Sequence, residues 1–195
     1  NNVVRGIEKL LKDSGVVIFE DPYLGDVIQK TSYDQIYDEH VFLFSAISVS
    51  HLFNLHGMEL IDLHHQKTHG GSMRYVLAKK GAYNPSPRVF DTLKEERKLG
   101  LDNLDKFIEF SDKVKKSKID LKKLLKDLKL NGKTIAGYAA TSKSTTVLNY
   151  CDIGIDLIDY ICDTTPIKQG RLSPGMHIPV VSHDEFIKNP PDYAF

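Results

Sequence analysis

The chain has 195 residues, of which 41% are hydrophobic, and its 26 Lys and Arg balance its 26 Asp and Glu to a formal net charge of zero. This length can bury a core and form one large or two small domains. The balanced charge argues against nucleic acid as the main partner, and no apolar run approaches the roughly 20 residues of a membrane span. A polar start and only two cysteines, Cys151 and Cys162, favour a reducing cytoplasm.

The first thirty residues predict one helix and one strand. Residues 3–12 have the apolar stripe of an amphipathic helix, and Gly15 marks its end. The β-branched run 16–20 predicts a short strand that is buried on both faces. These elements either join the α/β elements near the C-terminus or, as we favour, form the tail of a larger N-terminal domain.

Residues 33–40 combine two phenols, three carboxylates and an imidazole. In a helix, Tyr33, Tyr37, His40 and Phe44 would share one face. A histidine beside phenols and a carboxylate suits general base catalysis, because an unperturbed imidazole titrates near neutral pH. Charged and aromatic residues also crowd ordinary helix starts, so the pattern leaves both interpretations open.

The middle of the chain predicts a helix over residues 42–56 and strands over 58–64 and 72–78. Strand alternation would send His64 and His65 to opposite faces, so we expect no metal site there. The Gly pair that links the strands is typical of a wide turn. His69, Ser72 and Arg74 either contact a ligand at that turn or belong to a purely structural hairpin.

Residues 88–130 predict one or two charged helices with a break near Gly100, and their lysines read as a solvated face with i,i+4 Asp–Lys pairs. Beyond them, strands and helices alternate, which predicts a parallel, Rossmann-like sheet with its ligand at the strand C-termini. The fold class is therefore α/β, with a helical and two-stranded middle region before a Rossmann-like C-terminal domain. The expected elements are strands at 133–138, 157–162 and 178–181, a loop at 139–146, and helices from 147 and over 183–188 with Ser182 as N-cap.

The loop after Tyr138 is a second candidate site. It gathers hydroxyls and Lys143 at a helix start, where the helix dipole favours an anion. The run Gly137-x4-Ser142-Lys143-Ser144 approaches the Walker A pattern but lacks the glycine before the lysine, so an anion-contacting loop is favoured over a nucleotide hydrolase.

Four motifs in this order resemble the sugar C-methyltransferase family, over about residues 6–191. They are Tyr33-Asp34-x-Ile36-Tyr37-x-Glu39-His40, His69-Gly70-Gly71-Ser72-x-Arg74, Leu148-Asn149-Tyr150-Cys151-x-Ile153 and Lys168-Gln169-Gly170-x-x-x-Pro174-Gly175-x-x-Ile178-Pro179. The resemblance implies an enzyme that uses S-adenosylmethionine to methylate a ring carbon of a nucleotide-linked keto-deoxysugar.

The same resemblance implies roles for individual residues. His40 would be the general base, Glu39 would orient it, and Tyr37 would donate a hydrogen bond to the enolate oxygen. No metal is implied. The nucleotide-sugar would be held by Tyr33, His69, Ser72, Arg74, Tyr138, Ser142, Lys143, Asn149, Asp163 and Lys168.

The departures from the family pattern predict the domain organisation. The family carries a histidine where Asp38 stands and a Gly-Ala-x-Ala-Lys-Gly loop at 138–144, which implies a different sugar or nucleotide preference. Its zinc-binding cysteine motifs and Gly-rich adenosylmethionine site are not found in this sequence. We therefore expect residues 1–30 to be the tail of a truncated methyltransferase domain, 31–130 to be a helical linker and substrate region with the catalytic segment, and 131–195 to be the C-terminal Rossmann-like domain. The methyl donor would bind mainly elsewhere, and this part alone would be inactive.

Two other functions remain open at this stage. The chain could be a nucleotide-sugar binding module without methyl transfer, or another α/β nucleotide-binding enzyme that uses the Lys143 loop. All three interpretations share a nucleotide-linked ligand and involve neither nucleic acid nor membrane.

Overall fold

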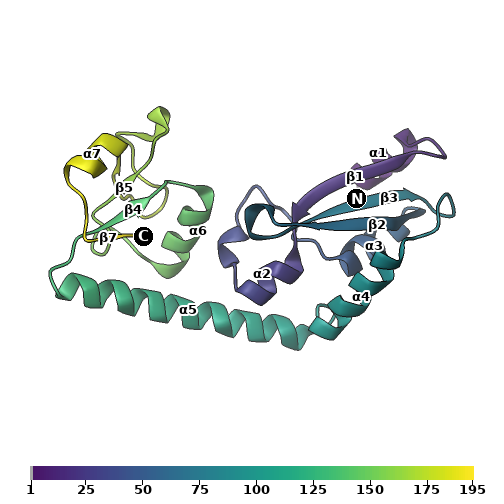
Figure 1. Cartoon of the computed structure of the whole chain (residues 1–195), viewed down its shortest axis with the longest axis horizontal. Helices are drawn as coiled ribbons and strands as arrows, with labels where there is room; N and C mark the ends of the chain where they lie inside the picture. The colour runs from purple at the N-terminus through teal and green to yellow at the C-terminus, as the bar shows by residue number, and fades with distance from the viewer. Residues whose placement is uncertain (1) are drawn as a thin grey trace. The chain divides into compact units, whose positions relative to one another are not determined.

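A computed structural model describes residues 2–195 and divides the chain into two compact units (Figure 1). Unit 1 combines the residues up to Ser32 with His40–Ser111, and unit 2 combines Tyr33–Glu39 with Asp112–Phe195. The mixed α/β class agrees with the prediction. The units do not follow the expected divisions at residues 30 and 130, because each is built from two separate stretches of chain.

Unit 1 is built on a three-stranded antiparallel sheet (Figure 1). β1 (Val16–Pro22), β2 (Met58–Gln66) and β3 (Ser72–Lys79) lie in the order β1-β3-β2, and the predicted β2–β3 hairpin is confirmed. Burial of β1 on both faces was a wrong expectation. Its residues alternate between exposed and partly buried, because an antiparallel sheet buries one face and leaves the other in solvent.

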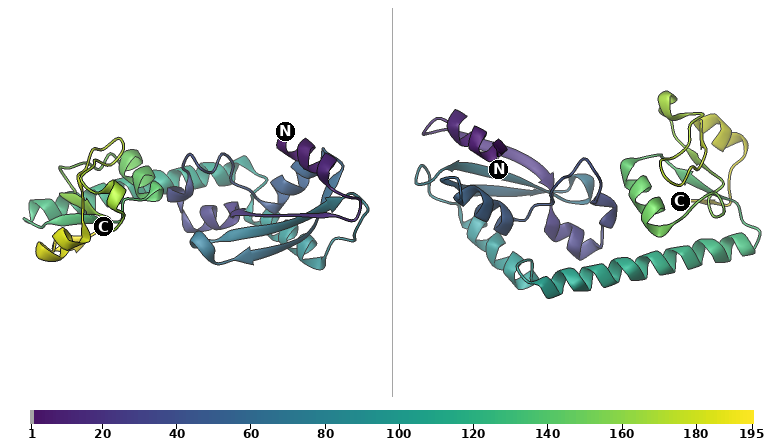
Figure 2. Two further views of the ribbon diagram at one scale, coloured as in Figure 1. Left: turned by 90° about the horizontal axis from the view of Figure 1, so that it is seen from above. Right: turned by 180° about the vertical axis from the view of Figure 1, so that it is seen from behind.

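Four helices complete unit 1: α1 (Asn2–Leu10), α2 (Leu24–Lys30), α3 (Ala46–Asn54) and α4 (Pro87–Leu99). Val4 of α1 packs into one apolar core with side chains of α3 and all three strands, and Figure 2 shows α1 beside β1. The helix expected from residue 42 begins only at Ala46. Ser45 ends the preceding extended segment because its side chain and that of Ser48 cap each other's backbone N–H groups.

The shared face that a helix would give to Tyr33, Tyr37, His40 and Phe44 does not form, because the described structure has no α-helix over residues 33–44. Tyr33–Gln35 form a short 3₁₀ turn, η1, and no regular element follows before α3. Tertiary contacts override the helical pattern, because Tyr33 and Gln35 are both buried and the Thr146 hydroxyl donates to the Ile36 carbonyl (3.3 Å). Tyr33 therefore belongs to unit 2, whereas His40 and Phe44 belong to unit 1.

The charged region forms two helices with the predicted break. Gly100 ends α4 in the left-handed conformation (φ 80°), and α5 runs over Leu104–Leu130. Lysine–aspartate pairs four residues apart, such as Lys116–Asp120 (2.7 Å), confirm its solvated face. Within residues 2–195, no helix combines the length and hydrophobicity that a bilayer span requires.

Unit 2 contains a four-stranded sheet in which every strand pair is parallel, as predicted. Its strands are β4 (Ile135–Tyr138), β5 (Tyr160–Cys162), β6 (Val180–Val181) and β7 (Tyr193–Ala194), in the order β6-β5-β4-β7. α6 (Ser142–Cys151) and α7 (His183–Lys188) are its helices, with η3 (Pro166–Lys168) between β5 and β6.

Several boundaries in unit 2 differ from the prediction: β4 and β6 each begin two residues later than expected, and α6 and β5 differ for identifiable reasons. α6 begins at Ser142 rather than at residue 147, because Thr141 and Ser144 form a capping box that starts the helix early. β5 begins at Tyr160 rather than at residue 157, because the N–H groups of Leu157 and Ile158 both bond to the Gly154 carbonyl in a turn. Ser182 caps α7 as expected.

Candidate functional site

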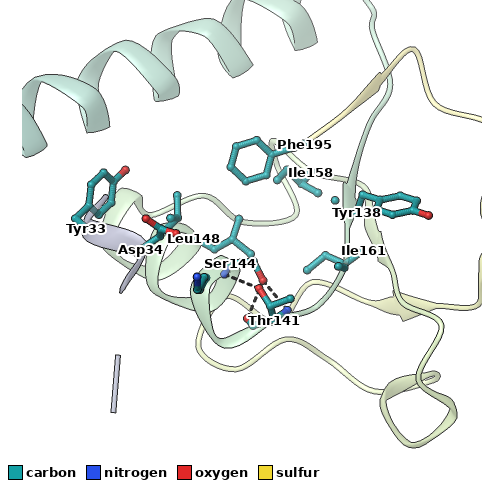
Figure 3. A pocket seen from close by; sticks show the side chains of 13 residues that line it. Tyr33, Asp34, Tyr138, Thr141, Ser144, Leu148, Ile158, Ile161 and Phe195 are labelled. Carbon is teal, nitrogen blue, oxygen red and sulfur yellow. Dashed lines mark hydrogen bonds between the residues drawn. The ribbon is translucent and has the colours of Figure 1, made fainter. Parts of the chain in front are cut away.

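A pocket of about 340 Å³ opens in unit 2 where β4 ends and α6 begins (Figure 3). The hydroxyls of Thr141 and Ser144 line one side, and Ile158, Ile161 and Phe195 line the apolar side. Only residues 139–141 connect β4 to α6. This edge of a parallel sheet is where α/β proteins bind ligands, as the sequence predicted.

The start of α6 carries the polar character of this pocket. The Ser144 N–H donates to the Thr141 hydroxyl (3.0 Å), and the Thr141 N–H donates to the Ser144 hydroxyl (2.9 Å). Ser142 and Lys143 follow in the first turn, where the helix dipole favours negative charge. Within the described part of the chain, the Lys143 ammonium forms no hydrogen bond or ion pair, so it can pair with an anionic ligand.

A second pocket of about 290 Å³ lies beside the same helix start and shares Thr141 and Ser144 with the first. Ser142 lines it, as does Arg171, which the sequence analysis did not single out. The Gly/Pro-rich composition around Arg171 indicated an ordered loop but not a site. Three cationic side chains, Lys143, Lys168 and Arg171, therefore border the pockets at this helix start.

Asp163 and Lys168 shape the turn after β4. Asp163 is only 6% exposed and accepts hydrogen bonds from the Ala140 N–H (2.8 Å), the Thr165 N–H (2.8 Å) and the Lys168 ammonium (3.0 Å). Lys168 also donates to the Ala140 carbonyl (2.8 Å). Burial opposes ionisation, but these hydrogen bonds hold the pKa of the Asp163 carboxyl well below its usual range. Both side chains thus hold the β4–α6 turn in place.

The other predicted residues of unit 2 lie in different positions. Asn149 lines neither pocket, because its amide donates to the carbonyls of Thr145 (2.8 Å) and Pro174 (3.0 Å) and so fixes the Gly/Pro-rich loop. Tyr138 lines the first pocket, but its exposed ring packs edge-on against the rings of His183 and Phe186. In Figure 3 this ring points away from Thr141 and Ser144.

Tyr33 is the aromatic wall of the first pocket. Its ring is buried against Tyr150 (centroids 5.5 Å apart), and its hydroxyl lies 3.3 Å from the Cys151 thiol. Burial, together with the hydrogen bond to Cys151, raises the pKa of Tyr33 to about 12, so the phenol stays protonated at neutral pH. Asp34 follows it along the pocket edge (Figure 3).

In unit 1, His40 lies beside Asp21 of β1. Its Nδ1 is 3.0 Å from Asp21 Oδ1, and each side chain is 22% exposed. Sequence reasoning missed Asp21, because the predicted strand ended at residue 20 whereas β1 extends to Pro22 and places Asp21 at an inward position. The other two predicted catalytic residues, the half-buried Tyr37 and the exposed Glu39, belong to the 33–39 segment of unit 2.

The His69–Arg74 turn is held by neighbours within unit 1. Ser72 is buried and donates to the Thr68 carbonyl (3.2 Å), and Arg74 pairs with Glu20 of β1 (2.8 Å). His69 adopts a left-handed conformation (φ 52°).

Gly71 is required at this turn for a structural reason. Its φ is 135°, and a Cβ there would lie only 2.0 Å from Asp26 Oδ2. The Lys30 ammonium donates to the Gly70 carbonyl (2.5 Å) and contacts Asp26 (2.9 Å). Gly71 therefore permits a close approach between this turn and Asp26 of α2.

The histidines of β2 point apart, as strand alternation predicted. His64 contacts Asp62 (3.1 Å) and His65 contacts Asp26 (2.5 Å). Among residues 2–195, no group of three His, Cys, Asp or Glu is placed to hold a metal ion.

Comparison with known proteins gives two matches. Residues 67–195 match the family described as the C-methyltransferase C-terminal domain. The chain is also 34% identical over 194 residues to the C-methyltransferase NovU of Streptomyces niveus, an alignment that covers 99% of this chain and 46% of that protein. The chain thus spans less than half the length of the curated relative that it matches.

Proposed function

The chain belongs to the C-methyltransferase family, and from this we propose that it is the C-terminal part of an S-adenosylmethionine-dependent enzyme that methylates a ring carbon of a nucleotide-linked keto-deoxysugar. Methyl transfer to carbon requires a carbanion, so a proton next to the ketone has to be removed. The observation that carries the proposal is the pairing of the His40 imidazole with the Asp21 carboxylate at 3.0 Å. An imidazole in such a pair is a suitable base at neutral pH.

His40 takes the proton from the carbon beside the ketone in this proposal. The negative charge that develops on the ketone oxygen is stabilised by a hydrogen bond from the Tyr37 hydroxyl, which donates its proton toward the enolate. Glu39 assists by orienting or polarising the His40 imidazole. The proton leaves His40 to solvent after the carbon has been methylated.

The pocket of unit 2 supports binding of the nucleotide part of the substrate. The start of α6 offers a helix dipole, hydroxyls and the Lys143 ammonium to a diphosphate. Tyr33 and Phe195 offer aromatic surface to a base or sugar ring. Asp163, Lys168 and Asn149 contribute to binding indirectly. They position the turn and the loop that border the pocket.

The residues present do not fit a complete adenosylmethionine site. The turn after β4 is Ala139-Ala140-Thr141 and lacks the glycines that let a backbone approach a nucleotide. Asp163, the acidic residue after the next strand, is already hydrogen-bonded to Ala140, Thr165 and Lys168, so it is not available to ribose hydroxyls. We therefore propose that the methyl donor binds mainly to residues outside this chain.

The test is mass spectrometry of sugars incubated with the complete protein and adenosylmethionine. A panel of nucleotide-linked 4-keto-6-deoxysugars is compared for the wild type, His40→Gln and the control His64→Gln, which alters another histidine of unit 1. We expect one sugar to gain a single methyl group with the wild type and the control, and a loss of roughly 10²–10⁴-fold in rate with His40→Gln. Full methylation by His40→Gln would refute the base, and methylation of no sugar would refute the substrate class.

A binding module without methyl transfer is the second candidate, supported by the Lys143 pocket. Incubation with the sugar in deuterated water separates the two, because a working base exchanges the proton next to the ketone even without a methyl donor. A module binds the nucleotide-sugar without exchange. In both cases Lys143→Ala should weaken binding by roughly tenfold or more, as for a lost charged hydrogen bond, whereas the exposed Lys188→Ala should not.

The nucleotide hydrolase is disfavoured by the short turn. The three residues between β4 and α6 leave too little backbone to wrap a phosphate in the Walker manner. If nucleotide binding required magnesium, the nucleotide hydrolase would be favoured again.

A further inference from the structure

We propose that Asp21 is the positioning residue of the His40 base. Its carboxylate accepts the Nδ1 proton of the imidazole, which leaves Nε2 as the nitrogen that takes the proton from substrate. This inference rests on the proposed function, since it assigns a partner to the base of that reaction. It also makes a claim about the imidazole tautomer that can be tested without catalysis.

The placement of Asp21 follows from the alternation of β1. Val17, Phe19 and Asp21 point inward, whereas Glu20 points outward and pairs with Arg74. Inward positions of a strand are normally apolar, so a carboxylate there requires an explanation. The ladder pairs Phe19 with Tyr75, which places Asp21 diagonally across from Tyr75 on the same face.

The surroundings of Asp21 leave its carboxylate dependent on His40. Phe19 stacks on Tyr75 (centroids 5.0 Å apart) and meets Phe44 edge-on (5.8 Å). Asp21 Oδ1 is shielded from solvent and accepts no hydrogen bond of full geometry among residues 2–195, so the His40 Nδ1 at 3.0 Å meets it as an ion-pair contact. A buried carboxylate without a partner is costly, so the imidazole and the carboxylate stabilise each other.

Other ionisable groups of unit 1 reinforce the negative character of this region. Burial raises the pKa of the Asp21 carboxyl, and the His40 imidazole opposes that rise. Burial, followed by the charges of Glu96 and Asp21, raises the pKa of the Tyr75 phenol far above its usual range. Tyr23 donates to Glu96 (3.0 Å) and is likewise kept protonated. The groups near the pair are thus neutral phenols and carboxylates, which favour the imidazolium that forms during proton removal.

The protons on the two ring nitrogens of His40 can be followed through the reaction. Before reaction the imidazole is neutral, with its proton on Nδ1 facing Asp21. Nε2 then accepts the substrate proton as the C–H bond breaks, and its electron pair moves into the enolate. The resulting imidazolium lies against the Asp21 carboxylate, which keeps the Nδ1 proton in place and stabilises the positive charge.

The first test reads the tautomer of His40 by ¹⁵N NMR of this chain. We expect Nδ1–H in the wild type and a clear rise of the Nε2–H form in Asp21→Asn. Asp62→Asn is the matched control, because Asp62 contacts a different histidine (His64, 3.1 Å), so it should alter His64 and leave His40 unchanged.

The second test measures methyl transfer by the complete protein. Asp21→Asn should lower kcat roughly 10- to 100-fold, a part of the roughly 10²–10⁴-fold that general base catalysis supplies, and leave KM unchanged. Asp21→Glu should recover part of the rate, because it restores a carboxylate. The exposed Asp13→Asn should have no effect.

Two results would overturn different parts of the argument. If His40→Gln stays active, the base of the proposed function is wrong. If His40→Gln is inactive but Asp21→Asn leaves both the His40 tautomer and kcat unchanged, the positioning role of Asp21 is wrong.

Discussion

Two buried carboxylates, one in each unit, have pKa values that are shifted in opposite directions. Glu96 of unit 1 is fully buried and accepts hydrogen bonds from the Tyr23 hydroxyl (3.0 Å) and the N–H groups of Ala46 (2.6 Å) and Ile47 (2.8 Å). Burial nevertheless raises its pKa. Asp163 of unit 2 is almost as buried, yet its hydrogen bonds lower its pKa.

The difference lies in the balance between lost hydration and hydrogen bonds: the bonds from Thr165, Lys168 and Ala140 outweigh the desolvation of Asp163, whereas the bonds to Glu96 do not outweigh its desolvation. All three donors to Glu96 are formally neutral, so they offset only part of the loss of hydration. Asp163 receives two N–H groups and also the Lys168 ammonium, which favours the ionised form directly. Glu96 therefore ties α4 to the start of α3 at a net electrostatic cost, whereas the hydrogen bonds to Asp163 more than offset the cost of its burial at the turn.

The largest expected effect is on unit 1. Glu96→Ala should lower the free energy of unfolding by about 3 kcal/mol, because it leaves the Ala46 and Ile47 N–H groups and the Tyr23 hydroxyl without their acceptor. Urea denaturation measures the loss. The exposed neighbour Glu95→Ala should change stability by less than about 0.5 kcal/mol. If Glu96→Ala lowered the free energy of unfolding only slightly, this would mean that water replaces the carboxylate as the acceptor for these three donors.

Asp163→Asn should have a smaller effect, about 2 kcal/mol, confined to unit 2. It removes the ion pair with Lys168 and weakens the hydrogen bonds that fix the β4–α6 turn. Amide hydrogen exchange should speed up at Ala140 and Thr165, with unit 1 unchanged. The exposed Asp156→Asn is the control, and equal exchange in both variants would contradict the role of Asp163.

The turn that Asp163 holds also contains strained backbone. Ala139 has a φ of 78°, in the left-handed region, whereas unit 1 places a glycine at its tight turn at residue 71. Ala139→Gly should stabilise unit 2 by about 1 kcal/mol, because glycine adopts this conformation without penalty. Thermal unfolding measures the gain. Ala140→Gly, which alters a residue outside the left-handed region, should instead destabilise.

The smallest expected effect is a pair of pH slopes with opposite signs. The folded state binds the Glu96 proton more tightly than the unfolded chain does, so the wild type should gain stability over Glu96→Gln as the pH falls through the raised pKa toward 4.5. The contribution of Asp163 is complete above its ordinary pKa of 3.8 and is lost as the pH falls toward the lowered value. Urea titrations of each variant and the wild type at several pH values measure how the stability difference changes with pH. If this change had the same sign for Glu96 and Asp163, the two carboxyls would not differ as proposed.

Local patterns predicted much of this fold. Strand alternation placed β2 and β3, Gly100 marked the break before α5, and the β/α alternation after residue 133 indicated the parallel sheet. These features depend on residues that are close in sequence. Pairing of β1 with β3 depends on contacts between residues fifty or more positions apart, which no local pattern records.

The candidate site was predicted unevenly for the same reason. The hydroxyls and Lys143 beside the helix were singled out from the sequence, although the helix itself was expected only from residue 147. The helical face considered for the 33–40 segment does not form, because the carbonyl of Ile36 is held by Thr146 of α6, more than a hundred residues away. Asp21 was missed because its significance depends on His40, which the chain brings to it only in the fold.

The match to the C-terminal family begins at residue 67, one residue after β2 ends at Gln66. A polypeptide that started there would carry β3 without either neighbour, so both edges of that strand would be open to other chains. It would also lose Tyr33 and Asp34 from the wall of the pocket. The first residue of the family match is thus not the boundary of a unit that folds on its own. We expect a protein cut at residue 67 to aggregate, whereas the 195-residue chain contains every strand of both sheets.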